Sequence, residues 1–116
     1  MRHQKGNKKL GKPTDQRLAL IKNLCVALVD NNRIVTTTHR AKAAKRVIET
    51  LITKAKVDTV ANRRYVMKHI NNKDFLKKLF ELSKAYKDRN GGYTRLINVG
   101  FRKGDAAQLS LIEFVN

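Results

Sequence analysis

The stretch YTRLINVGFRKGDAAQLSLIEFV (residues 93–115) decides the fold of this 116-residue chain. Its two ends, 93–101 and 107–115, are rich in β-branched and aliphatic residues and predict two strands. The segment GFRKGD (100–105) joins them with two glycines and two cations, a composition typical of a hairpin loop. We therefore expect the chain to finish with an antiparallel β-hairpin.

The sequence before this hairpin is mainly helical in pattern. Helices are expected over 14–32, 38–56, 58–70 and 73–87, where apolar residues recur at helical spacing. The exception is RIVTT (33–37), a short β-branched run that predicts a third strand. The order helix, strand, three helices, two strands predicts a two-layer α+β domain, with a small sheet that has helices on one face. One globular domain is expected over 14–116.

Helix periodicity also predicts which residues are buried. The first helix is apolar nearly all round, so we expect it to be the most buried, with Cys25 in the core and Thr14 as its N-cap. The second has Thr38 as its expected cap, the third Asp58 or Thr59. Expected core positions of the last three helices are Ala41, Ala44, Ile48, Leu51 and Ala55, then Val60, Tyr65, Val66 and Ile70, then Phe75, Leu76, Leu79, Phe80 and Tyr86.

The N-terminus, MRHQKGNKKLGK (1–12), combines five cations with no acid and little apolar surface. We expect residues 1–13 to form a basic arm. One interpretation is a solvated, disordered tail, and the other is an extension that becomes ordered on a nucleic acid. No apolar segment follows the cations as in a secretory signal, which favours a cytosolic protein.

The formal net charge is +17, from 26 basic and 9 acidic residues. Such a surface repels itself, and a polyanion that neutralises it would release counterions on binding. Nucleic acid is the expected partner, and an anionic membrane surface is the weaker alternative. Because no apolar run approaches the roughly 20 residues of a membrane span, no membrane insertion is expected.

Signals of catalysis are missing from the sequence. The three histidines are far apart, the single cysteine cannot build a zinc cluster, and the phosphate-binding glycine motifs are absent. We therefore predict a protein that is not an enzyme and has no metal, no cofactor and no small-molecule substrate.

The basic residues fall in several patches, which favours a folded RNA over the single recognition helix of a DNA-reading module. Two alternatives stay open: a histone-like nucleoid protein that binds duplex DNA, and an RNA-modifying enzyme or its accessory subunit. Tyr93 also has two interpretations. It lies between two glycines and Arg95, as RNA-contacting aromatics do, but it also suits a strand-start residue that packs on the core.

Three segments carry a family resemblance: the opening MRHxK with KLGK, TKAKVDTVANRR (53–64), and GGYTRLINVGFRKGDAAQLSLIEFV (91–115). From end to end the chain resembles bacterial ribosomal protein seventeen of the large subunit. The resemblance implies a structural constituent of the cytoplasmic ribosome that binds large-subunit rRNA near the exit of the nascent-peptide tunnel and supports subunit assembly. It also implies neighbouring large-subunit ribosomal proteins as partners, and an α-β-α3-β2 fold.

Both lines of inference together predict the RNA-binding residues. The arm and its junction contribute Arg2, His3, Lys5, Lys8, Lys9, Lys12 and Arg17. The second helix contributes Arg40, Lys42, Lys45 and Arg46. The third helix, the glycine loop and the hairpin contribute Arg63, Arg64, Gly91, Gly92, Tyr93, Arg95, Arg102 and Lys103.

Overall fold

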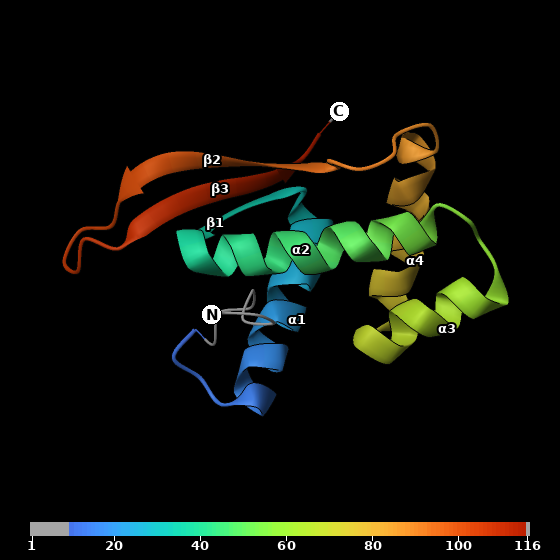
Figure 1. The fold of residues 1–116 in the computed structure, drawn as a ribbon, viewed down its shortest axis with the longest axis horizontal. Coiled ribbons are helices and arrows are strands. Elements are labelled where there is room, and N and C mark those ends of the chain that lie inside the picture. The colour runs from blue at the N-terminus through green and yellow to red at the C-terminus, as the bar shows by residue number, and fades with distance from the viewer. Residues whose placement is uncertain (1–9, 116) are drawn as a thin grey trace, which may run out of the picture.

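A computed structural model describes residues 10–115 and confirms the predicted α+β architecture. Helices and strands follow one another in the expected order: α1 (Thr14–Asn31), β1 (Arg33–Thr37), α2 (Thr38–Ala55), α3 (Val60–His69), α4 (Lys73–Ser83), the 3₁₀ turn η1 (Lys84–Tyr86), β2 (Thr94–Phe101) and β3 (Gln108–Phe114). Figure 1 shows the sheet as one layer and the helices as the other. The N-terminal arm lies outside the described residues as far as residue 9.

The sheet is antiparallel throughout, in the order β1-β3-β2. Alternate residues of the central strand, Ser110, Ile112 and Phe114, are buried against the helices. The other face of the sheet carries an aliphatic row, because Leu111 pairs with Val35 of β1 and with Ile97 of β2. Val35 is 56% exposed and Ile97 43%, so this row remains open to solvent.

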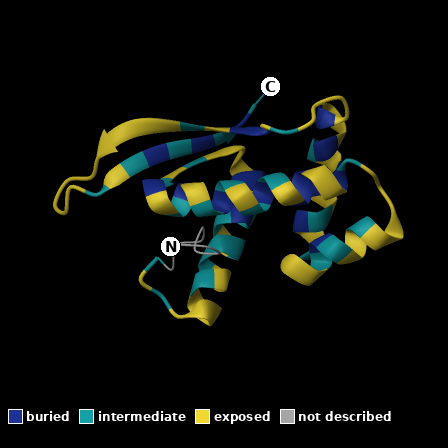
Figure 2. Ribbon diagram, in the orientation of Figure 1, coloured by how far each residue is buried: buried dark blue, intermediate teal, exposed yellow. Residues whose placement is uncertain are grey.

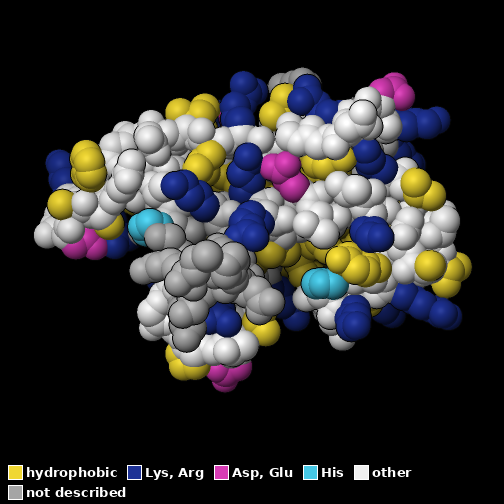
Figure 3. Space-filling view, in the orientation of Figure 1, with side chains coloured by type: hydrophobic (Ala, Val, Ile, Leu, Met, Phe, Trp, Pro, Cys, Tyr) yellow, Lys and Arg dark blue, Asp and Glu magenta, His cyan; other side chains and the backbone are white. Residues whose placement is uncertain are grey.

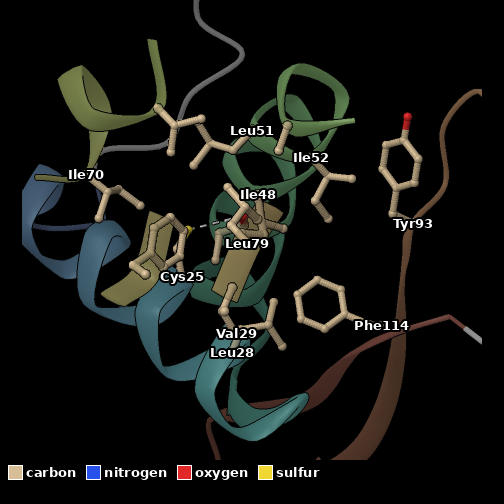
Figure 4. Close-up of a cluster of buried hydrophobic side chains, with 14 of the residues drawn as sticks. Cys25, Leu28, Val29, Ile48, Leu51, Ile52, Ile70, Leu79, Tyr93 and Phe114 are labelled. Atoms are coloured by element: carbon tan, nitrogen blue, oxygen red, sulfur yellow. Dashed lines mark hydrogen bonds between the residues drawn. The ribbon is translucent and has the colours of Figure 1, made fainter. Parts of the chain in front are cut away.

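Helix α2 is the central helix of the core. All five positions predicted from its periodicity are buried, from Ala41 at one end to Ala55 at the other. This helix packs against α1, α3 and α4 and also against all three strands. Figure 4 shows Ile48, Leu51 and Ile52 among side chains from the surrounding elements. Burial of this stripe fixes the opposite, cationic face of α2 toward solvent.

The expectation that α1 is the most buried helix is wrong. Only Cys25, Leu28 and Val29 are buried, all in its second half, while Leu18 is 60% exposed. Figure 2 shows the first turns of α1 extending away from the other helices. Cys25 itself is fully buried, as predicted for a core cysteine, and this burial raises the pKa of its thiol to about 12.

Two of the predicted helix caps are also wrong. Thr14 and Thr38 are the first helical residues, and neither α1 nor α2 has a side-chain cap. The Thr38 hydroxyl instead hydrogen-bonds the Gln108 carbonyl (3.3 Å) and the Ser110 hydroxyl (2.7 Å), which ties α2 to β3. Thr59 does cap α3, as expected, by accepting from the amide of Asn62.

The last two helices depart from expectation at their ends. Val60 is 65% exposed because it starts α3, whereas Val66 and Ile70 are buried as predicted. Helix α4 stops at Ser83, and the turn η1 then carries Tyr86 into the core. Tyr65 is only partly buried, and its ring borders the surface between α2 and α3.

Candidate nucleic-acid interface

The outer face of α2 carries the first set of predicted residues. Lys42 and Arg46 are exposed on the side of the helix opposite the buried stripe, and the partly buried Arg40 and Lys45 flank that stripe. Figure 3 shows Lys and Arg side chains gathered over this helix. Within residues 10–115, neither Arg40 nor Lys42 has a carboxylate within salt-bridge distance, while Lys45 pairs with Glu49 at 3.4 Å. Arg40 and Lys42 therefore present positive charge that no carboxylate of residues 10–115 neutralises.

The glycine loop before β2 is anchored to the same helix by Glu49. Its carboxylate accepts from the Gly92 amide (3.2 Å) and from the Thr94 hydroxyl (2.9 Å). Lys56, two turns further along α2, donates to the Arg89 carbonyl at 2.6 Å. Gly92 has φ +63°, a left-handed conformation that favours glycine. The loop and the cationic face of α2 thus form one continuous surface, which we call the α2–loop surface (residues 40–56 and 89–92).

Tyr93 does not belong to that surface. Its side chain is 1% exposed, and its ring packs against Tyr86 with centroids 5.3 Å apart. Its hydroxyl lies 3.3 Å from that of Thr53. A buried ring cannot stack on a base, so the ring of Tyr93 is not an RNA-contacting aromatic, and the alternative, a strand-start residue that packs on the core, is confirmed. Contact of the Tyr93 backbone with RNA, as part of the glycine loop, stays a prediction.

Three predicted arginines have carboxylate partners within the chain. Arg63 makes a bidentate pair with Asp58 (Nε–Oδ1 2.6 Å, Nη2–Oδ2 2.8 Å), Arg102 pairs with Asp105, and Arg95 lies 2.8 Å from Glu113. These hydrogen bonds lower the pKa of Asp58, and that of Asp105 to about 2, so the pairs stay charged at neutral pH. Since each guanidinium side chain is still half exposed, its remaining N–H groups are open to a second acceptor.

The remaining predicted cations are spread over the molecule. Arg64 is exposed on α3, and Lys103 at the hairpin tip, while Lys12 and Arg17 are partly buried near the start of α1. Figure 1 shows the hairpin tip and α3 at opposite ends of the molecule. The structure therefore brings the α2 and loop residues together, but not the hairpin or α3 residues. Five predicted residues lie outside the described part: Arg2, His3, Lys5, Lys8 and Lys9.

Sequence reasoning missed how the loop is held in place. Glu49 and Lys56 bind the loop backbone at Gly92 and Arg89. Glu49 and Lys56 are seven residues apart, two helical turns, and so face the same side of α2. That spacing was visible in the sequence, but the loop atoms they contact are 33 to 43 residues away. Such contacts depend on the tertiary fold.

A variant of Glu49 tests this anchor. Glu49→Gln should lower the free energy of unfolding by about 1–3 kcal/mol, because it removes the charge that pairs with Lys45 and replaces one of the two accepting oxygens by an NH2 group. Urea denaturation followed by circular dichroism measures this. The matched control is Glu81→Gln, which also removes one acid but breaks only an exposed pair with Lys84, so it should change stability by less than about 1 kcal/mol. Equal stabilities of the two variants would contradict the anchoring role.

Across residues 10–115, no group of three or more His, Cys, Asp or Glu side chains is arranged to hold a metal ion. Among the described helices, none has both the length and the apolar character needed to cross a bilayer.

Comparison with known proteins gives consistent matches. The family model described as "Ribosomal protein L17" matches residues 20–115. The chain is 48% identical to the large ribosomal subunit protein bL17 of Dictyoglomus turgidum, covering 99% of this chain and all of that protein. It is 44% identical to the bL17 of Treponema denticola over the whole of this chain and 65% of that protein.

Proposed function

The chain belongs to the bacterial ribosomal protein L17 family of the large ribosomal subunit, and we propose that it is fixed there by binding large-subunit rRNA. The observation that carries this proposal is the α2–loop surface, where exposed cations and a preorganised loop backbone lie side by side. The cations of this surface would displace condensed counterions from the RNA phosphates, which makes binding favourable and dependent on salt.

The other cations extend the contact to further RNA segments. The paired arginines, Arg63, Arg95 and Arg102, keep part of each guanidinium exposed and can add phosphate contacts there. The hairpin tip and α3 lie at opposite ends of a molecule that is 45 Å long, so contacts at both and at α2 would extend over its whole length. A folded rRNA can follow cations that are distributed in this way. The family match supports RNA over the nucleoid alternative, in which duplex DNA is the ligand.

We assign the protein a structural role and no catalytic step. It would support assembly of the large subunit, in the cytoplasm, near the exit of the nascent-peptide tunnel; support for that position comes from the family resemblance. The partners would include other large-subunit proteins. The aliphatic row of Val35, Leu111 and Ile97 supports a protein neighbour, since it offers neither cations for phosphates nor aromatic rings for bases.

Sedimentation of cell lysate through a sucrose gradient tests this function. The protein should travel with the large subunit at about one copy each. Salt weakens each phosphate contact, but many simultaneous contacts around the protein should give enough affinity for it to remain there after a high-salt wash. A loosely held polyanion binder would be released by salt. Release, or migration with the nucleoid, would overturn the proposal and favour the DNA-binding alternative.

A further inference from the structure

Two aromatic rings and an ammonium group form a small cluster between α2 and α3. The rings of Tyr65 and His69 lie 4.6 Å apart, tilted by 39°. The Lys54 ammonium lies 5.2 Å from the centre of the Tyr65 ring. Tyr65 is partly exposed, and both His69 and Lys54 are exposed. Figure 3 shows a histidine beside an apolar patch over α3, on the face that also displays the cations of α2.

Hydrogen bonding sets the orientation of the histidine. His69 Nδ1 lies 3.0 Å from the Tyr65 carbonyl oxygen, which can only accept, so in the neutral ring Nδ1 carries the hydrogen. The other nitrogen, Nε2, is then an acceptor. Within residues 10–115, His69 Nε2, the Tyr65 hydroxyl and the Lys54 ammonium have no hydrogen-bond or salt-bridge partner. The two rings and the neighbouring ammonium therefore carry three polar groups that can each bind a further hydrogen-bond partner.

The cluster is continuous with the α2–loop surface. Arg46, Thr50 and Lys54 are spaced four residues apart on α2, so they form a row along one side of the helix. This row ends at the Tyr65 ring, where Lys54 lies. An RNA strand whose phosphates follow the cations of α2 would bring its next nucleotide to the two rings.

We infer that Tyr65 and His69 form a platform for one unpaired base of the RNA, with Lys54 placed for the adjoining phosphate. The inference rests on the proposed function and adds the class of nucleotide to it. Bases within a duplex are stacked and unavailable to a side chain, whereas an unpaired base stacks readily on an aromatic ring. The exposed His69 ring supplies that surface, and Tyr65 extends it when the Lys54 ammonium leaves the Tyr65 ring for the phosphate. The unfilled Nε2 and hydroxyl groups supply hydrogen bonds to the base or to a 2′-hydroxyl.

Ultraviolet cross-linking of the full chain to purified large-subunit rRNA tests the contact directly. Stacked rings and bases cross-link, so the tryptic peptide 65–68, released by cleavage after Arg64 and Lys68, should carry a nucleotide detectable by mass spectrometry. Wild-type protein that binds the rRNA saturably without this cross-link would overturn the base platform and leave the proposed function standing. Failure of the wild type to bind saturably would overturn both.

Binding of variants gives a second, independent measurement. Tyr65→Leu keeps apolar volume against the core but removes the ring, and it should weaken rRNA binding by about 5- to 30-fold without changing the salt dependence. Tyr65→Phe, the matched control, keeps the ring and should bind within about threefold of wild type.

Lys54→Gln should instead reduce the slope of log affinity against log salt by about one. His69→Ala, at an exposed position, covers the case in which Tyr65→Leu does not fold, and should weaken binding at least threefold. Equal affinities for wild type, Tyr65→Leu and His69→Ala would contradict the platform.

Discussion

Tyr93→Ala should lower the free energy of unfolding by about 3–5 kcal/mol, as expected for removing a buried aromatic ring. The ring is 1% exposed and contacts Tyr86, so its loss leaves a cavity where β2 starts. Domains of this size are stable by only about 5–15 kcal/mol, and a chain of net charge +17 is further weakened by self-repulsion. The variant should therefore retain only part of the wild-type stability without RNA.

Tyr93→Phe is the matched control for this prediction. It keeps the ring and loses only the hydroxyl contact with Thr53, so it should lower stability by about 0.5–1.5 kcal/mol. Urea denaturation of both variants measures the difference, and rRNA binding by Tyr93→Phe should equal that of wild type. A Tyr93→Ala variant that stays fully stable but binds RNA poorly would show that the ring contacts RNA after all.

Removal of residues 2–9 should have the largest effect on RNA binding. The deletion takes away Arg2, Lys5, Lys8 and Lys9 and leaves every residue of the described fold in place. Four lost phosphate contacts should reduce the slope of log affinity against log salt by about 3, and affinity for large-subunit rRNA should fall on the order of 100-fold at physiological salt. Filter binding across a salt series measures both quantities.

The control for the deletion is a full-length chain in which the same four cations are glutamines. If charge is what the arm contributes, this variant should match the deletion in affinity and in salt slope. Both should retain the wild-type circular dichroism spectrum and melting transition. Loss of the melting transition on deletion would show that residues 2–9 are needed for folding, and the interpretation of the arm as an RNA-binding extension would then fail.

Sequence patterns predicted the parts of the fold that depend on local composition and periodicity. The stripe on α2 follows from the 3.6-residue period of a helix, the three strands follow from their β-branched and aliphatic runs, and both predictions are confirmed. The burial of α1 was not predictable in this way. Its apolar residues surround the helix, so no period indicates that its first half, including Leu18, extends beyond the core.

The candidate site was predictable in residue type but less so in role. The cations of α2 follow from the buried stripe, because a side opposite the core must face solvent. The partners of Arg95 and Tyr93 do not follow, since Glu113 and Tyr86 reach them through strand register and tertiary packing. Tyr65 and His69 are four residues apart, a spacing that places two rings together on one helix face. That pairing was available from the sequence and was overlooked.

The order β1-β3-β2 has a consequence for synthesis of the chain. Among the described elements β3 is translated last, so β1 and β2 have no partner between them until residues 108–114 emerge. Contacts of α2 with β3, such as those of Thr38, form at the same late moment. Helices can form from local contacts during elongation, but the sheet cannot. The sheet therefore assembles only after residues 108–114 are synthesised, on helices that have already had time to form.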